Sequence, residues 1–283
     1  VELSLGGRAF LCNSGAEANE CAIKLVRRRA HARGIERPEI VVLDGAFHGR
    51  TLAALAATPR LAREDLFGPL PPGFVPVPRD DAAALRVAVG SRTAAVMIEP
   101  IQGEAGVHEI ADEVLIAARE ACDEAGALLV LDEIQTGMGR TGTLWAYEGT
   151  PVRPDVITSA KALGGGLPVG ACLTDPGVGE GLTLGEHGST FAGGPICARA
   201  ALAALEILAD PGLLAAVGER DGELRAAIGK HPAVDGIRGR GLMIGLALAD
   251  GVDSRVVVEA ALADGLVVNA PNPGTIRLLP PLP

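Results

Sequence analysis

The chain has 283 residues, a formal net charge of −10 at pH 7 and a pI of about 5.0. Lysine and arginine are scattered rather than gathered in one stripe, which argues against a nucleic-acid partner. No apolar run is long enough to span a bilayer, and the five cysteines are widely spaced without a Cys-x-x-Cys pair, so we expect no membrane partner and a cytoplasmic protein with reduced thiols.

Short apolar runs alternate with helical patterns over the first two thirds of the chain. Residues 16–32 and 111–125 have helical spacing, and Gly126 is placed to end the second helix. The apolar runs are continuous, as in strands that are covered on both faces, and they lie at 40–43, 94–98, 127–131, 156–157 and 169–173. This alternation predicts an α/β domain with a mostly parallel sheet.

A Pro/Gly break near Asp210 separates this part from the last stretch of the chain. We expect a helix from Pro195 to about Leu208 before the break, and short strands at 238–245 and 267–268 after it. The chain is therefore predicted to divide into a large domain, 1–210, and a smaller α+β domain, 211–283. It begins without methionine and stops within an apolar segment, so we expect both domains to be truncated at the chain ends.

Lys161 lies where an apolar run enters the triple-glycine turn at 164–166. If the stem of this lysine lies along buried apolar surface, desolvation lowers the pKa of its ammonium group, and the free amine can form a Schiff base with an aldehyde. The alternative is an ordinary surface lysine before a loop. This segment alone does not decide between the two interpretations.

Other predicted strands also end in polar residues. Asp44, Glu99 and Asp132 each follow an apolar run directly. Because the carboxyl ends of parallel strands meet at one edge of a sheet, we expect these carboxylates to converge with Lys161 on one crevice. A buried carboxylate at position 132 needs a cation or several donors. Its partner is expected to be either an internal arginine such as Arg140 or the protonated nitrogen of a heterocyclic ligand.

Ser14 and Glu17 have the spacing of a capping box at the start of the first predicted helix. The same turn presents N–H groups at the positive end of the helix dipole, and Gly15 permits close approach by a phosphate. Capping boxes are usually structural, so this one gains a functional meaning only together with Lys161. A Schiff-base lysine, a phosphate cradle and a strand-end aspartate are what a pyridoxal 5′-phosphate site requires.

From these residues the chain resembles the class III (ω-amino) aminotransferases, which have the aspartate aminotransferase fold, fold type I. Six blocks occur in the family's order and run almost from end to end, and within them the residues are closest to those of the acetylornithine members. Together with Lys161, the blocks are NSGAEANE at 13–20, FHGRT at 47–51, EPIQGE at 99–104, DEIQTGMGRTG at 132–142, HGSTF at 187–191 and RLLPP at 277–281.

The resemblance implies the roles of a cofactor site. Lys161 would carry pyridoxal 5′-phosphate and shuttle a proton, and Asp132 would keep the ring nitrogen protonated. Gln135 would bond the side of the ring hydroxyl, and Phe47 would stack on the ring face, although a core phenylalanine is the alternative for that position. The remaining cofactor contacts would come from Ser14, Gly15, Ala16 and Glu99, and from Thr190 of a neighbouring subunit, which implies a homodimer with a shared active site.

The resemblance also implies a substrate end. Arg50, with Ser189, would bind the α-carboxylate of the amino donor, because a planar guanidinium grips a carboxylate with two donors. Arg277 would bind the α-carboxylate of the 2-oxo acid, and Glu104 would pair with Arg277 while the ω-amine reacts. Each of these charges has an ordinary surface salt bridge as its alternative. His48 and His187 are expected to be packed or supporting histidines, and we expect no metal.

The expected reaction moves the ω-amino group of N2-acetylornithine to 2-oxoglutarate and gives N-acetylglutamate 5-semialdehyde and glutamate, as in arginine biosynthesis. One alternative is another ω-amino donor: ornithine, succinylornithine, 4-aminobutyrate or a lysine-pathway substrate. A second is a non-catalytic remnant that only binds cofactor or dimerises. A nucleotide-dependent oxidoreductase is disfavoured, because no Gly-x-Gly-x-x-Gly follows the first strand.

Overall fold

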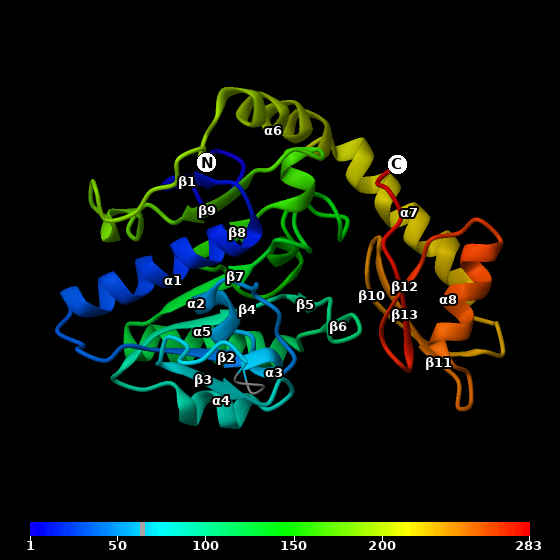
Figure 1. Cartoon of the computed structure of the whole chain (residues 1–283), viewed down its shortest axis with the longest axis horizontal. Helices are drawn as coiled ribbons and strands as arrows, with labels where there is room; N and C mark the ends of the chain where they lie inside the picture. Colours follow the sequence, from blue (N-terminus) through cyan, green and yellow to red (C-terminus); the bar gives the residue numbers. More distant parts are fainter. Residues whose placement is uncertain (63–65) are drawn as a thin grey trace.

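The computed structural model describes residues 1–62 and 66–283 (Figure 1). Its largest element is a seven-stranded sheet with the order β1-β9-β8-β7-β4-β2-β3. The neighbours from β8 to β3 pair in parallel, whereas β9 pairs antiparallel with both β8 and β1. The expected α/β fold with a mostly parallel sheet is confirmed. The strands are β1 (Ala9–Cys12), β2 (Glu39–Leu43), β3 (Phe74–Val77), β4 (Thr93–Ile98), β7 (Leu128–Asp132), β8 (Val156–Ser159) and β9 (Gly170–Thr174).

Helices cover both faces of this sheet (Figure 1). The long helix α1 (Gly15–Ala32) packs on one face, and α5 (Asp112–Ala125) with α4 (Ala82–Ala88) packs on the other. As the sequence predicts, α5 ends at Gly126, whose φ of 64° is left-handed and favours glycine. The shorter helices are α2 (Leu52–Ala56), α3 (Pro59–Ala62) and the 3₁₀ turns η1 (Ala146–Gly149), η2 (Lys161–Gly164) and η3 (Gly179–Gly181).

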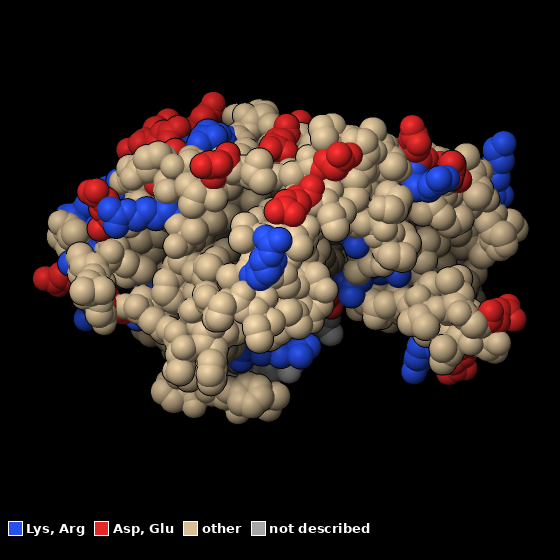
Figure 2. Space-filling view, turned by 90° about the horizontal axis from the view of Figure 1, so that it is seen from above, with Lys and Arg blue, Asp and Glu red and all other residues tan. Residues whose placement is uncertain are grey.

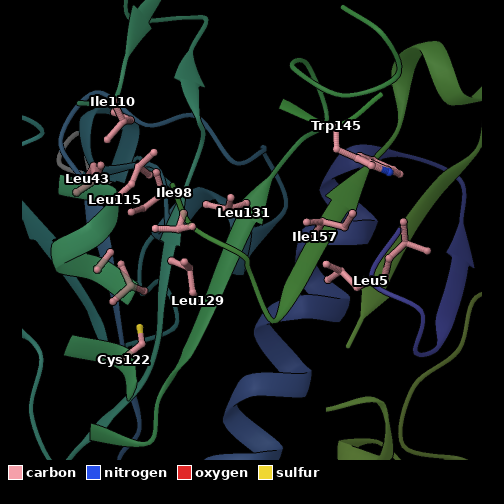
Figure 3. Close-up of a cluster of buried hydrophobic side chains, with 14 of the residues drawn as sticks. Leu5, Leu43, Ile98, Ile110, Leu115, Cys122, Leu129, Leu131, Trp145 and Ile157 are labelled. Atoms are coloured by element: carbon pink, nitrogen blue, oxygen red, sulfur yellow. The ribbon is translucent and has the colours of Figure 1, made fainter. Parts of the chain in front are cut away.

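Alternate side chains of each central strand belong to two different cores. Val130 of β7 packs with α1, whereas Leu129 and Leu131 pack with residues of α5 such as Leu115 and Cys122 (Figure 3). Every residue of β4, β7 and β8 is buried. Because each buried aliphatic side chain contributes about 1.5–3 kcal/mol, these strands form a rigid base for the groups at their ends.

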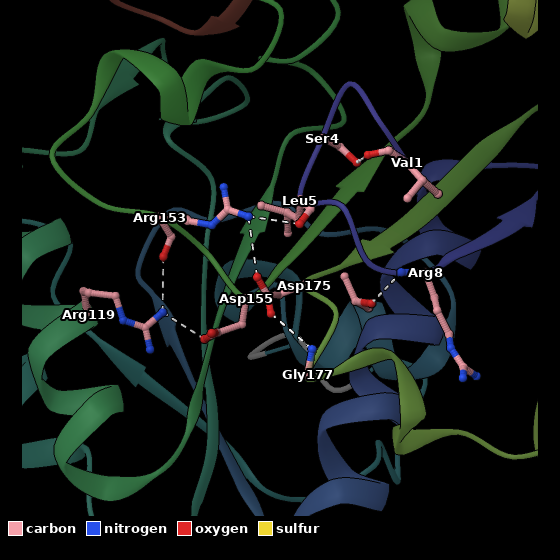
Figure 4. Close-up of polar contacts among 10 residues, drawn as sticks. Val1, Ser4, Leu5, Arg8, Arg119, Arg153, Asp155, Asp175 and Gly177 are labelled. Atoms are coloured by element: carbon pink, nitrogen blue, oxygen red, sulfur yellow. Dashed lines mark hydrogen bonds and ion pairs between the residues drawn. The ribbon is translucent and has the colours of Figure 1, made fainter.

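The start of β8 is held by Asp155. This carboxylate accepts a hydrogen bond from Arg119 Nη1 at 2.8 Å (Figure 4). It also accepts one from Leu129 N at 2.7 Å, so it ties β8 to β7 and to α5. Nearby, Arg153 Nη2 donates to the carbonyl oxygen of Leu5 at 3.0 Å. These contacts fix the strand that leads to Lys161.

The last part of the chain forms an antiparallel sheet of four strands with the order β10-β11-β13-β12. Asp210 caps α7, so the predicted Pro/Gly break is a bend of 67° between α6 and α7. The prediction of a strand at 267–268 is wrong: this stretch connects α8 to β12, and Val267 is 83 % exposed. β-branched residues favour a strand only where a partner strand packs on them, and sequence composition alone does not show this. The elements are α6 (Pro195–Leu208), α7 (Pro211–Ile228), β10 (Val234–Arg240), β11 (Met243–Leu248), α8 (Ser254–Ala263), β12 (Asn269–Asn272) and β13 (Thr275–Leu278).

A small hairpin, β5 (Ile101–Gln102) and β6 (His108–Glu109), extends from the large sheet toward the small one (Figure 1). The face seen in Figure 2 is hollowed between the two parts of the molecule, and positive and negative side chains are interspersed on it. Within the described residues, no single helix is long and apolar enough to cross a membrane; α6 and α7 reach that length and composition only as a bent pair.

Candidate active site

The carboxyl ends of β4, β7 and β8 open into a cavity of about 760 Å³. It brings together most of the residues singled out in the sequence, from five separate segments. Asp44 does not line it, because β2 lies one strand further out than β4. The predicted residues that line the cavity are Ser14, Gly15, Ala16, Phe47, Arg50, Glu99, Glu104, Asp132, Gln135 and Lys161.

Lys161 begins the turn η2 directly after β8, with a left-handed φ of 49°. Such a conformation is uncommon for a side chain other than glycine, and it persists where the surrounding structure enforces it. The residue is exposed, and it lines the open cavity. Desolvation by the cavity walls still lowers the pKa of its ammonium group below the ordinary 10.5, although the carboxylates of Asp132 and Glu99 oppose this shift.

Asp132 ends β7, and its side chain is held by three donors. Asn19 Nδ2 donates to Oδ2 at 2.8 Å, His48 Nδ1 lies 2.8 Å from the same oxygen, and Ile134 N donates to Oδ1 at 3.1 Å. The carboxylate is 4 % exposed. Arg140, the arginine considered as its partner, instead donates to main-chain carbonyl oxygens. The buried charge is therefore compensated by a histidine and two neutral donors.

His48 is buried behind Asp132. Burial alone would lower the pKa of this imidazole, but the hydrogen bond to Asp132 and the charges of Asp132 and Glu99 outweigh burial and raise the pKa above 6.5. Glu99, which follows β4, accepts a hydrogen bond from Phe47 N at 2.8 Å. Desolvation by burial raises the pKa of Glu99 to about 7, although the charge of His48 opposes the shift. The carboxyl groups of Asp132 and Glu99 thus share this end of the sheet with the imidazole of His48 and the amine of Lys161.

The start of α1 forms the opposite wall of the cavity. Ser14 is the N-cap residue, and its side chain accepts a hydrogen bond from Glu17 N at 3.2 Å. The predicted capping box is only half formed, because Glu17 Oε2 accepts from Asn13 N at 2.7 Å rather than from Ser14 N. Gly15 and Ala16 line the cavity from the first helical turn, where main-chain N–H groups have no helical partner and are able to bind an anion.

Three further predicted residues line the cavity between these walls. The side-chain oxygen Oε1 of Gln135 is buried and, among the described residues, has no hydrogen-bond partner. The guanidinium carbon of Arg50 lies 5.7 Å from the centre of the Phe47 ring. Phe47 therefore presents an aromatic surface at the cavity and not in the core, and Arg50 adds a cation beside it.

Glu104 and Arg277 form an ion pair at the edge of the cavity. Arg277 Nη1 donates to Glu104 Oε1 at 2.7 Å, and the side chains are 10 % and 43 % exposed for Arg277 and Glu104, respectively. Arg277 comes from β13 of the small sheet and Glu104 from the turn of the β5–β6 hairpin. The pairing expected from the sequence is present, and it joins the two sheets.

Ser189 and Thr190 do not line the cavity. Ser189 Oγ accepts a hydrogen bond from Asn13 Nδ2 at 2.9 Å, which places it behind the cavity wall, and Thr190 is exposed on the adjoining surface segment. The expected contact between Arg50, Ser189 and one substrate carboxylate thus has only Arg50 at the cavity. Thr190 was predicted to act on a neighbouring subunit, and this role stays a prediction.

One supporting residue was not identified from the sequence, and the partner of another was not. Asn19 is fully buried on α1 and donates to both Asp132 and the carbonyl oxygen of His48. An asparagine on the apolar face of a predicted helix was the available signal, since buried amides need partners. His48 was expected to be a packed or supporting histidine, and its partner is Asp132, which lies 84 residues away in the chain.

The chain matches the family "Aminotransferase class-III" over residues 1–283. It is 48 % identical to the acetylornithine aminotransferase of Mycolicibacterium smegmatis, covering 99 % of this chain and 71 % of that protein. It is 45 % identical to the acetylornithine aminotransferase of Methanocaldococcus jannaschii, covering 100 % of this chain and 72 % of that protein. Among solved structures it is similar to an ornithine aminotransferase of Toxoplasma gondii, with a TM-score of 0.91 and 35 % identity, covering 97 % of this chain and 68 % of that one. It is also similar to an N-acetylornithine aminotransferase of Stenotrophomonas maltophilia, with a TM-score of 0.83 and 38 % identity, covering 97 % of this chain and 69 % of that one.

Proposed function

The chain belongs to the class III aminotransferases, and we propose that it transfers the ω-amino group of N2-acetylornithine to 2-oxoglutarate, giving N-acetylglutamate 5-semialdehyde and glutamate. The observation that carries this proposal is the single cavity that holds Lys161, Asp132 and the start of α1. The relatives of 45–48 % identity named above are acetylornithine aminotransferases, which favours this amino donor.

The residues at the cavity fit pyridoxal 5′-phosphate. Lys161 would hold it covalently through Nζ, Asp132 would accept a hydrogen bond from its ring nitrogen, and the N–H groups of Gly15 and Ala16 would bind its phosphate. The unpaired oxygen of Gln135 is a buried acceptor that a ring hydroxyl would satisfy. When bound, this cofactor supplies an aldehyde carbon that bonds to amines and a ring that accepts electrons from the substrate carbon.

The chain's own residues supply the proton chemistry. The lowered pKa of the Lys161 ammonium increases the fraction of neutral amine, whose Nζ can take a proton from the substrate carbon and return it. Asp132 cannot swing away, because Asn19 and His48 hold its Oδ2. A fixed carboxylate keeps a cationic ring nitrogen in place without reorganisation during the reaction.

Arg50, which lines the cavity, and Arg277, which lies at its edge, suit substrates that carry carboxylates. We propose that Arg50 binds the α-carboxylate of the amino donor, and that Arg277 binds the α-carboxylate of the oxo acid once Glu104 is displaced. The 2.7 Å pair between Glu104 and Arg277 supports this assignment, because it leaves the arginine neutralised until a competing carboxylate arrives.

We also propose a homodimer in which Thr190 reaches the phosphate of the partner's cofactor. The exposure of the segment that carries Thr190, including Phe191 at 79 % exposed, supports a surface that a second copy covers. We further propose that residues 1–210 and 211–283 are separate domains. The bend at Asp210 and the separate four-stranded sheet support this division.

The test is covalent capture of the cofactor together with turnover. Purified protein is incubated with pyridoxal 5′-phosphate and borohydride, and the modified peptide is located by mass spectrometry. We expect the adduct at Lys161, and we expect Lys161→Ala to lose the adduct and about 10²- to 10⁴-fold in turnover, the typical contribution of a proton-transfer group. Full turnover by Lys161→Ala would refute the proposal, and an adduct without turnover by the unmodified chain would favour a remnant that only binds cofactor.

Ornithine is the second candidate for the amino donor. The similarity to the Toxoplasma gondii ornithine aminotransferase, with a TM-score of 0.91, favours it. Steady-state rates with N2-acetylornithine, ornithine, succinylornithine, 4-aminobutyrate and a lysine-pathway amine would discriminate, since the highest kcat/KM identifies the donor that the transition state fits best.

A further inference from the structure

The turn of the β5–β6 hairpin, residues 103–107, is held by the small sheet at three consecutive residues. Arg277 pairs with the side chain of Glu104, as described above. Asn272 Nδ2 donates to the carbonyl oxygen of Ala105 at 2.9 Å, and Arg238 Nη2 donates to the carbonyl oxygen of Gly106 at 2.9 Å. We call Asn272 and Arg238 the turn clamp. The clamp contacts only the main chain, so it acts on the position of the turn and not on its side chains.

Apolar packing reinforces the clamp at its base. Val107 is fully buried and packs with Ile101 and with Met243 of β11. Its φ of 58° is an outlier for a β-branched residue, which costs about 1–3 kcal/mol and requires support from the surroundings. A Cβ atom on Gly245 would lie 2.8 Å from Val107 Cβ, so the glycine is what allows the turn to sit directly on β11.

Each clamp residue is itself fixed within the small sheet. Arg238 Nη2 also donates to Thr275 Oγ1 at 2.8 Å, and Asn272 Oδ1 accepts a hydrogen bond from Gly274 N at 3.1 Å. The clamp therefore moves with β12 and β13, the second of which carries Arg277. This linkage couples the position of Glu104 to that of Arg277, although the two residues come from two different sheets.

We propose that the turn clamp is a positioning device that keeps Glu104 on Arg277, and that it thereby sets how weakly this end of the cavity binds an anionic substrate. Glu104 competes with a substrate carboxylate for the same guanidinium. Without the clamp the turn loses two main-chain anchors, and the local concentration of the competing carboxylate at Arg277 falls. Arg277 stays in place, because β11 and β12 hold its strand.

The proposal rests on the proposed function for its meaning in catalysis, but its test does not require turnover. Glutarate, a five-carbon dicarboxylate without the oxo group, is titrated into cofactor-loaded protein by calorimetry. We expect Asn272→Ala to tighten glutarate binding by about 2- to 10-fold, the range that corresponds to the net contribution of one hydrogen bond. Asn269→Ala, an exposed asparagine on the same strand, is the matched control and should leave the affinity unchanged.

A double-mutant cycle separates positioning from general loosening of the fold. Glu104→Gln should tighten glutarate at least as much as Asn272→Ala, and adding Asn272→Ala to Glu104→Gln should change nothing further, because the clamp acts through Glu104. Arg238→Lys, which keeps the charge but loses the forked donor, should shift the affinity in the same direction. It provides the same comparison if Asn272→Ala does not fold.

Three results would overturn the proposal. They are weaker glutarate binding in the clamp variants, an equal effect of Asn272→Ala in both backgrounds, and no tightening in Glu104→Gln. With turnover, the clamp variants should lower the KM for 2-oxoglutarate and leave kcat for the amino-donor half-reaction unchanged. A chain that transaminates none of the amines would refute the proposed function, whereas the glutarate cycle would still decide the role of the clamp.

Discussion

Replacing Glu99 by glutamine is expected to stabilise the protein at neutral pH and not at acid pH. Glu99 is 6 % exposed, and burial raises its pKa from an ordinary 4.5 to about 7. Glutamine keeps a side-chain oxygen that can accept the hydrogen bond from Phe47 N, so the substitution removes the ionisation while it preserves the main contact.

The magnitude follows from linkage between protonation and folding. Because the folded state binds the proton of Glu99 more tightly than the unfolded state does, the free energy of unfolding falls as pH rises from about 4.5 to about 7. A difference of about 2.5 pKa units corresponds to about 3 kcal/mol at 1.36 kcal/mol per unit. The penalty is absent below about pH 4 and complete above about pH 8, and the glutamine variant does not have it.

Urea unfolding of the cofactor-free protein at several pH values from 5 to 8 measures this difference directly. The stability of Glu99→Gln relative to the unmodified chain should increase steadily with pH, by up to about 3 kcal/mol. Glu259→Gln makes the same substitution at an exposed position of α8 and serves as the control. A stability difference that stays constant across this pH range would show that Glu99 does not ionise at the expense of folding, and the reasoning would be wrong.

Substitutions at two other positions test the support of the cavity. His48→Ala should lower the free energy of unfolding by about 3 kcal/mol, because Asp132 loses its charged partner, and His48→Gln should lose less. Since the pKa of His48 is raised in the folded state, the stability lost in His48→Ala should be largest below about pH 6.5 and should shrink as pH rises through the folded-state pKa. Denaturant midpoints measured at pH 6 and at pH 9 would reveal this difference. Gly103→Ala would place a Cβ 2.1 Å from Gln135 Oε1, and the flexible Gln135 amide would have to move. We expect the free energy of unfolding to stay within about 1 kcal/mol of the original value and cofactor binding, measured by absorbance titration, to weaken about 10-fold. Unchanged cofactor binding would contradict the role of Gln135.

The layered architecture could be predicted because its signals are local. The apolar run at 94–98 is uninterrupted, and β4 is buried on both faces, so the composition of the strand directly reflects its position in the sheet. Gly126 ends α5 for a local reason as well, namely its left-handed conformation. The antiparallel direction of β9 has no such signal, because a buried strand has the same apolar composition whether it runs parallel or antiparallel to its neighbours.

Much of the cavity could be predicted for a topological reason. Glu99, Asp132 and Lys161 follow strands that are adjacent and parallel, so the order of the chain places them side by side. The partners of Asp132 could not be predicted in the same way. Asn19 and His48 lie on elements that pack against the sheet, and only the three-dimensional packing of α1 and of the segment after β2 brings them to the carboxylate.

The arrangement of donors around Asp132 explains why its support matters as much as its charge. Oδ2 already accepts from Asn19 and His48, whereas Oδ1 accepts only from Ile134 N at 3.1 Å. Since a carboxylate oxygen accepts about two hydrogen bonds, the remaining capacity lies on Oδ1. A ligand nitrogen in the cavity would therefore meet one fixed oxygen of a carboxylate that cannot rotate without breaking two buried hydrogen bonds. Loss of either buried partner would leave only one of these two restraints on the rotation, so cofactor orientation depends on side chains that never touch the cofactor.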